Sequence, residues 1–131
     1  MPTTPSRTAG YQVIYNRLLS AARERSRVFH SEVRGLLEAM PGNPLLRPGV
    51  DEVLAQIASD EHRARRPMLI ALVVTGKSIP GDIFFTSARN LGVLKTSDPA
   101  EEMRFWMAEE ARVYDTWAGS IRLKADPTEQ F

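Results

Sequence analysis

Apolar residues recur at helical spacing in the first part of the chain. Tyr11, Ile14 and Leu18 are separated by three and four residues, which predicts a helix from Tyr11 to about Arg25 with one apolar face. Residues 27–29 follow as a short stretch that is too rich in β-branched character to extend the helix, and they predict an edge strand. The chain therefore opens with a helix and a short strand.

Two more helices are predicted between residues 31 and 64. Ser31 is placed to cap the first of them, because its hydroxyl can accept a backbone N–H that the helix leaves unpaired. Residues 41–44, Pro-Gly-Asn-Pro, end this helix, and the second helix runs from about Val50 to Ala64. Both have an apolar face, made of Val33, Leu36, Leu37 and Met40 in the first, and of Val50, Val53, Leu54, Ile57 and Ala58 in the second.

The longest apolar run of the chain is 68–74, Met-Leu-Ile-Ala-Leu-Val-Val. A run without alternation is typical of a strand buried on both faces, so we expect a central strand here. Residues 75–81 are expected to form a loop or a hairpin tip. From Asp82 two outcomes are open: a short helix that Gly92 ends in a left-handed conformation, or a returning strand over 82–85.

The clearest helix signal lies near the end of the chain. Asp98 is suited to cap a helix, Pro99 suits its first position and Glu101 its third, and apolar residues then repeat at helical spacing as far as Gly119. Residues 1–10 are rich in Pro, Thr and Ser and are expected to be disordered, and residues 120–131 to form a flexible tail. A single domain is thus predicted over residues 11–119.

The order of these elements predicts an α+β fold that is mostly helical with a small two- or three-stranded sheet. It matches a winged helix, in which two helices form a helix-turn-helix and a hairpin forms the wing. In that fold the helix beginning at Val50 takes the recognition position. We therefore expect a winged-helix-like domain.

The composition limits the kinds of functional site that the chain can form. The 131 residues include no cysteine and only two histidines, His30 and His62, which excludes disulfides and thiolate metal sites. The seven-residue apolar run is far shorter than the roughly 20 residues that span a bilayer. No apolar leader segment is visible near Met1, so we expect a cytoplasmic protein with no cofactor, no metal and no membrane association.

Three local patterns contain catalytic residue types. Residues 71–78, Ala-Leu-Val-Val-Thr-Gly-Lys-Ser, match a relaxed phosphate-loop pattern, but strand formers fill the loop and Pro80 prevents a following helix. Residues 60–62, Asp-Glu-His, point in different directions on a helix, and residues 30–32, His-Ser-Glu, are adjacent without forming a triad. We predict no catalytic residue; an enzyme would need His30 or residues 60–62 to converge in a pocket.

The charges are unevenly distributed. Residues 1–50 carry seven arginines and three acids, and residues 98–131 carry four basic and eight acidic residues, within a net charge of +1. Two arginine clusters and one loop lysine could contact a phosphate backbone. Against this, Asp51 and Glu52 begin the recognition helix and would repel phosphate. The predicted nucleic-acid-binding residues are Arg25, Arg27, Arg63, Arg65, Arg66 and Lys77.

The last helix carries more aromatic residues than one buried face needs. Most of them are expected in the core, and the surplus predicts an interface with a protein partner or a second copy of the chain. The predicted interface residues are Phe105, Trp106, Tyr114 and Trp117. The leading hypothesis is a non-enzymatic nucleic-acid-binding or regulatory module; the alternatives are a protein-interaction module, such as a homodimer or an accessory subunit in a phage–host setting, and a small enzyme.

Several segments resemble a pattern found in small uncharacterised bacterial and phage proteins. They are residues 66–74, Pro80-Gly81 with Phe84-Phe85, Ala88 and Leu91-Gly92, and Phe105-Trp106 with Val113-Tyr114 and Trp117. The resemblance covers about residues 11–118 and implies a bacterial or phage origin. Residues 29–33 followed by 66–74 are also similar to the winged-helix domain of DNA alkyltransferase-like proteins. The reactive cysteine is absent, so that resemblance implies only non-catalytic binding.

Overall fold

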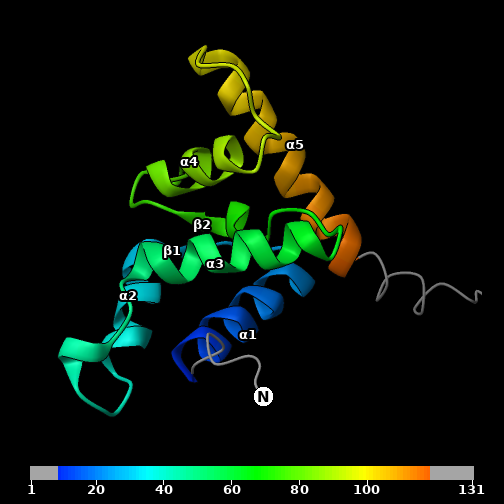
Figure 1. Ribbon diagram of the computed structural model, residues 1–131. Helices are drawn as coiled ribbons and strands as arrows, with labels where there is room; N and C mark the ends of the chain where they lie inside the picture. The colour runs from blue at the N-terminus through cyan, green and yellow to red at the C-terminus, as the bar shows by residue number, and fades with distance from the viewer. Residues whose placement is uncertain (1–8, 119–131) are drawn as a thin grey trace, which may run out of the picture.

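A computed structural model describes residues 9–118 of the protein (Figure 1). Helices dominate this part of the chain, and the strands are only two residues long. In chain order the elements are α1 (Ala9–Arg23), β1 (Val28–Phe29), α2 (His30–Glu38), the 3-10 helix η1 (Pro44–Leu46), α3 (Val50–Arg63), the 3-10 helix η2 (Leu69–Leu72), β2 (Val73–Val74), α4 (Asp82–Asn90) and α5 (Pro99–Trp117).

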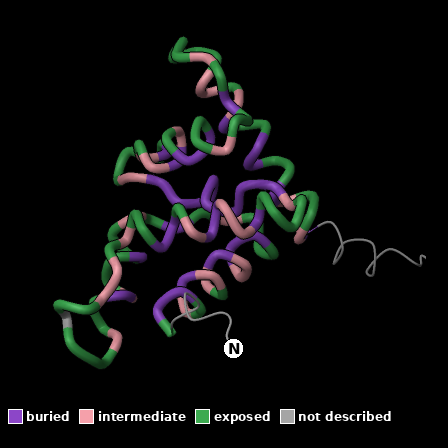
Figure 2. Tube along the Cα trace, in the orientation of Figure 1, coloured by how far each residue is buried: buried purple, intermediate pink, exposed green. Residues whose placement is uncertain are grey.

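The apolar run 68–74 is the centre of the core. All seven residues are buried, as Figure 2 shows for the middle of the molecule, and α1, α3 and α5 pack against η2. The prediction of a continuous strand here is wrong, because only β2 is extended. The indole N–H of Trp106 donates to the carbonyl of Ala71, and the backbone N–H of Met68 donates to Glu109. Side chains of α5 thus provide partners that neighbouring strands would supply in a sheet.

The sheet consists of β1 and β2, which pair in parallel with Val28 opposite Val73 and Phe29 opposite Val74. The prediction of a mostly helical α+β fold with a small sheet is confirmed. The winged-helix arrangement is not confirmed, because a wing is an antiparallel hairpin and these strands are parallel. A single antiparallel bridge between Val74 and Pro80 closes the 75–79 turn, in the segment expected to be a loop or hairpin tip.

The helix ends show which local signals determined the structure. Asp98 caps α5 as predicted, its carboxylate accepting the N–H of Glu101 at 3.1 Å. Gly92 ends α4 with φ +79°, so the helical alternative for residues 82–85 is correct. The prediction for Ser31 is wrong, because α2 already begins at His30 and Phe29 occupies the cap position without a side-chain hydrogen bond.

The predicted N-terminal disorder and flexible tail fall mainly on residues 1–8 and 119–131, which lie outside the described residues. Ala9 and Gly10, also expected to be disordered, form the start of α1. None of the helices in the described part of the chain has the length and apolar character that crossing a membrane requires. A cytoplasmic location stays a prediction.

Helix α3 crosses the molecule and separates two ends (Figure 1). Its first residues lie near α2, the loop over residues 39–49 and the turn between β2 and α4. Its last residues lie near the C-terminal ends of α1 and α5. A helix of 14 residues spans about 20 Å, so groups at the two ends of α3 are well separated.

Candidate functional site

The structure brings the two arginine clusters of the sequence together at one end of the molecule. We call this the arginine end, and it comprises Arg23, Arg25, Arg27, Arg63, Arg65 and Arg66. Arg23, from the end of α1, and Arg66, which follows α3, lie 5.8 and 5.9 Å from the ring centre of Trp117. Arg25 stacks over Tyr114 at 5.8 Å and Arg27 over Trp106 at 4.9 Å. Two segments distant in the sequence therefore meet on one face of α5.

Three of these arginines are hydrogen-bonded to carboxylates of the protein itself. Arg27 donates from Nε and Nη2 to Glu110, at 2.6 and 3.0 Å. Arg66 donates from Nε and Nη2 to Glu61, at 2.9 and 2.8 Å, and that carboxylate is buried. Arg63 is paired with Asp60. The bidentate contacts of Arg27 and Arg66 occupy the Nε–Nη2 edge of each guanidinium, which is an edge that could otherwise bind a phosphate.

The same contacts change the ionisation of their neighbours. Burial and the hydrogen bond with Glu61 raise the pKa of Tyr15, whose hydroxyl donates to Glu61 at 2.9 Å. Burial, followed by the charge of Glu110, raises the pKa of Tyr114 to about 12. The hydrogen bond that Arg27 donates to Glu110 raises the pKa of Arg27. The network holds neutral tyrosines and charged arginines in place, which is a structural role.

The remaining predicted nucleic-acid residues are divided between the two ends. Arg25 lies 4.0 Å from Asp115, and Arg65 is exposed in a left-handed conformation with no ion pair among residues 9–118. Lys77 lies in the turn before α4, where Thr75 and Gly76 share a hollow with Asp51 at the start of α3. The six predicted residues therefore do not form one face, because Lys77 lies across the length of α3 from the arginines.

One of the four predicted aromatic interface residues is buried, and the other three pack against the core. Trp106 is buried and its Nε1–H donates to the Ala71 carbonyl at 2.8 Å, so it cannot contact a partner. Phe105, Tyr114 and Trp117 are partly buried and pack against the core cluster. Among the aromatic positions predicted as an interface, three thus keep some accessible surface and one keeps almost none.

The residue triplets that suggested catalysis do not converge. Glu61 points into the core and binds Arg66, whereas His62 is exposed. His30 has both ring nitrogens engaged, with Asp51 and with Arg34, each at 3.4 Å. Within residues 9–118, no three His, Cys, Asp or Glu side chains gather as a metal site.

At the opposite end of α3 the structure shows a feature that sequence reasoning missed. We call residues 43–48 the leucine turn. Its leucines are 91% (Leu45) and 81% (Leu46) exposed, whereas the next most exposed large apolar residue of the described chain, Met107, is 59% exposed. Isolated exposed leucines are ordinary, but two adjacent ones at this level are a concentrated apolar surface.

The leucine turn is held firmly by hydrogen bonds. The side chain of Asn43 accepts the N–H of Leu45 at 2.9 Å, and its backbone carbonyl accepts the N–H of Leu46 at 3.0 Å. Arg47 donates to the carbonyls of Glu38 and Met40 at 3.3 and 2.7 Å, which ties the turn to the end of α2. These hydrogen bonds define the backbone conformation that presents the leucines.

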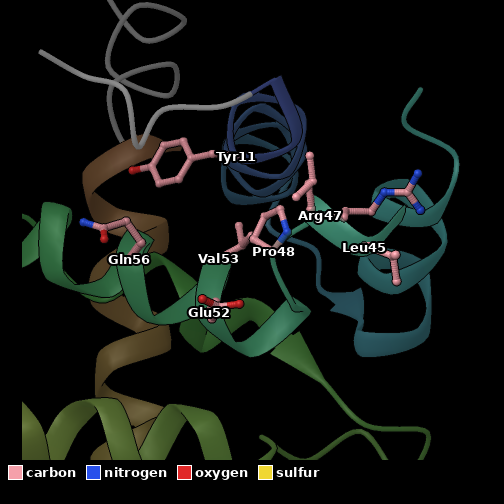
Figure 3. A pocket seen from close by; sticks show the side chains of 8 residues that line it. Tyr11, Leu45, Arg47, Pro48, Glu52, Val53 and Gln56 are labelled. Carbon is pink, nitrogen blue, oxygen red and sulfur yellow. The ribbon is translucent and has the colours of Figure 1, made fainter. Parts of the chain in front are cut away.

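A hollow of about 390 Å³ lies beside this turn (Figure 3). Figure 3 shows Leu45 and Arg47 on one side, Tyr11 and Gln56 on the other, and Val53 with Pro48 between them. A second hollow of about 260 Å³, lined by residues including Leu37, Met40 and Leu46, lies on the other side of the turn. The leucine turn is thus a ridge between two hollows.

A signal for this ridge was present in the sequence. Leu45 and Leu46 lie between Pro44 and Pro48, outside every predicted helical face, so no periodic pattern assigned them to the core. Apolar residues in a proline-bounded turn have few ways to become buried. Only the fold shows that they project beside a hollow rather than into the core.

The chain matches no protein-family model, and comparisons with curated proteins and with solved structures also give no match.

Proposed function

We propose that this protein is a non-enzymatic protein-interaction module that docks a partner through the leucine turn and the adjoining hollow. The observation that carries the proposal is the 91% exposure of Leu45 on the rim of the 390 Å³ hollow. Exposed apolar side chains beside a hollow fit the buried centre of a protein interface, which is more apolar than its rim. The partner surface that fits is another protein with an apolar projection and an apolar recess.

The hydrogen bonds of the turn support this function. Association costs free energy for each mobile side chain and loop that becomes ordered. Because Asn43 and Arg47 already fix the backbone around Leu45 and Leu46, less of that cost remains for the leucine turn.

Photo-cross-linking tests the proposal directly. A photoreactive benzoylphenylalanine replaces Leu46 in one protein and Met107, an exposed apolar residue of α5, in a matched control. In cells that express the position-46 variant, we expect a covalent adduct between residue 46 and another protein. The position-107 control should not form this adduct. Adducts shared by both positions, or none at position 46, would contradict the proposal.

Nucleic-acid binding is the second candidate function, and the meeting of two arginine clusters at the arginine end favours it. In a winged-helix type of binding, α3 would enter a groove and the 75–79 turn would act as the wing. Asp51 and Glu52 at the start of α3 and the internal ion pairs of Arg27 and Arg66 weigh against it. It therefore ranks below protein interaction.

Salt dependence tests this second candidate. If the arginine end binds DNA, affinity falls steeply between low and physiological salt, because neutralised phosphates release counterions. The double substitution Arg25→Ala with Arg65→Ala should then weaken binding, while Lys77→Ala at the other end should not. A salt-independent signal, or equal effects of the two sets, would exclude the arginine end as the contact surface.

A further inference from the structure

The arginine end also contains a hollow of about 390 Å³. Separate segments of the chain line it: the end of α3 with the residues that follow, the turn after α4, and α5. The leucine turn lies at the opposite end of α3, so the inference drawn from this hollow does not depend on the proposed function. We call it the Arg65 hollow, and its lining includes His62, Arg65, Met68, Val93, Phe105 and Arg112.

We infer that the Arg65 hollow binds a small organic anion in which a carboxylate or phosphate group is attached to a flat apolar ring. The inference is carried by the juxtaposition of the unpaired Arg65 side chain with the accessible apolar surface of Val93 and Phe105. Ligand pockets typically measure about 300–1,000 Å³ and combine apolar walls with a few polar groups. The Arg65 hollow has both properties.

The ion pairs around the hollow indicate the charge of the ligand. Arg66 is paired with Glu61, and that carboxylate therefore already has a cation. Glu109 is paired in the same way with Arg112. Arg65 adds a positive charge with no ion pair and no side-chain hydrogen bond within residues 9–118. The lining thus carries an uncompensated positive charge, which a bound anion would balance.

The free side chains of the hollow are not needed to complete the end of α3. The carbonyls of residues 60–62 already accept the backbone N–H groups of residues 64–66. The side chain of His62, like that of Arg65, makes no hydrogen bond in the described part of the chain. The guanidinium of Arg65 can therefore donate two parallel hydrogen bonds to an oxyanion, and the imidazole of His62 adds a further polar contact.

A comparison with Arg25 separates this arginine from an ordinary helix-end residue. Arg65 has φ +63° and Arg25 has φ +56°, and each follows a helix in the left-handed conformation that glycine adopts more readily. The side chain of Arg25 stacks over Tyr114 and lies 4.0 Å from Asp115. Arg65 has no such contact within residues 9–118, and its side chain lines the hollow instead.

The apolar part of the ligand is indicated by α5 and the turn after α4. Phe105, Glu109 and Arg112 are spaced by four and three residues, so they share one face of α5. The ring of Phe105 is supported by that of Phe84, with 5.8 Å between the ring centres. Val93 is 42% exposed. An aromatic ring of the ligand can pack against this surface while its charged group reaches the guanidinium.

Titration followed by two-dimensional amide NMR tests the inference on the full chain. The probes are phenyl phosphate, benzoate, inorganic phosphate and phenol, each added separately. We expect phenyl phosphate or benzoate to bind with a Kd of about 1 mM, as a small fragment does, and the one that binds more tightly identifies the anionic group. The largest shifts should fall on residues 62, 65, 93, 105 and 112. Inorganic phosphate and phenol, which each carry only one half of the ligand, should bind about tenfold more weakly.

A pair of glycine variants supplies the matched control. Arg65→Gly removes the guanidinium and suits the backbone, so it should weaken binding about tenfold without lowering the urea midpoint of unfolding. Arg25→Gly makes the same substitution in the same backbone conformation outside the hollow, and it should leave the affinity unchanged.

Several results would overturn the inference. Shifts that do not cluster on the residues of the hollow, or no binding of phenyl phosphate and benzoate, would show that it is not a ligand site. Equal binding of inorganic phosphate and phenyl phosphate would show an ordinary cationic surface with no apolar subsite. Equal losses of affinity in the two glycine variants would show that Arg65 does not hold the anion.

Discussion

The indole Nε1–H of Trp106 donates to the backbone carbonyl of Ala71 at 2.8 Å, joining α5 to the 3-10 helix η2. Both groups are buried, and the residues are 35 positions apart. Together with the Glu109 contact to the Met68 N–H, this bond allows an apolar segment to lie in the core without a full strand ladder. The helix α5 therefore packs over the core and also contributes buried side chains to it.

Replacing Trp106 with Phe tests that relationship. The substitution keeps an aromatic ring but leaves the Ala71 carbonyl buried without its partner, which costs about 1–3 kcal/mol of unfolding free energy, with a further cost from lost volume. Trp117→Phe is the matched control, because its Nε1 has no hydrogen-bond partner among the described residues. Urea unfolding should show a larger loss of unfolding free energy for Trp106→Phe than for Trp117→Phe. Equal losses would show that the hydrogen bond from Trp106 to Ala71 does not stabilise the fold.

The pairing of Arg66 with Glu61 predicts a structural rather than a binding defect. Arg66→Ala leaves the Glu61 carboxylate buried without its cation, and we expect a loss of about 2–3 kcal/mol, below the range for fully buried pairs because Arg66 is partly exposed. The neighbouring Arg65→Ala should stay within about 0.5 kcal/mol of wild type. Thermal or urea unfolding of both variants measures the two losses of stability. Similar stabilities of the two variants would contradict a structural role for the pairing of Arg66 with Glu61.

Alkaline pH should weaken the fold through Tyr114. Its pKa is raised from 10.0 to about 12 in the folded protein, so the folded state holds the phenolic proton more strongly than the unfolded state. Its contribution to stability is therefore present below pH 10 and is lost as the pH rises toward about 12. Unfolding free energies at about pH 9 and about pH 11 should fall more for wild type than for Tyr114→Phe.

Other groups titrate in the same range, and for this reason the difference between the two proteins is the measured quantity. The Tyr114→Phe protein also loses the hydroxyl bond to the Ser26 carbonyl, which lowers its stability at both pH values. A pH-dependent loss that is identical in both proteins would show that Tyr114 does not contribute.

Two glycines should respond in opposite directions to the same substitution. Gly92 has φ +79°, and residues 92 and 93 donate to the carbonyls of Arg89 and Ala88 in the helix-terminating pattern of α4. Gly92→Ala should cost about 1 kcal/mol because a side chain disfavours that conformation. Gly35 lies inside α2 with open space around it, so Gly35→Ala should add about 0.5–1 kcal/mol. The unfolding free energy of both variants is measured by urea denaturation. A change of the same sign in both variants would contradict this explanation.

The sequence was sufficient to predict most helices. The spacing of Tyr11, Ile14 and Leu18 and the cap at Asp98 depend on interactions within a few residues, and the structure confirms both helices. The run 68–74 was different, because an unbroken apolar stretch indicates burial without specifying conformation. Its geometry depends on Trp106 and Glu109, which lie more than 30 positions away.

The candidate site could be predicted only in part. Charge clustering indicated the arginines that meet at the arginine end, but the pairing of Arg27 with Glu110 spans 83 positions and has no local signal. The leucine turn was missed because residues 45 and 46 belong to no periodic face. Whether an apolar side chain in a loop projects outward depends on tertiary packing.

The parallel pairing of Val28 with Val73 has a consequence for how the protein folds. The two residues are 45 positions apart, and α2 and α3 lie in the loop between them. Closing so long a loop is entropically costly, so we expect the ladder to form only after these helices have begun to pack and to contribute little to early, local folding. Amide exchange across this pair would thus report on the closing of the whole α2–α3 layer rather than on two isolated strand residues.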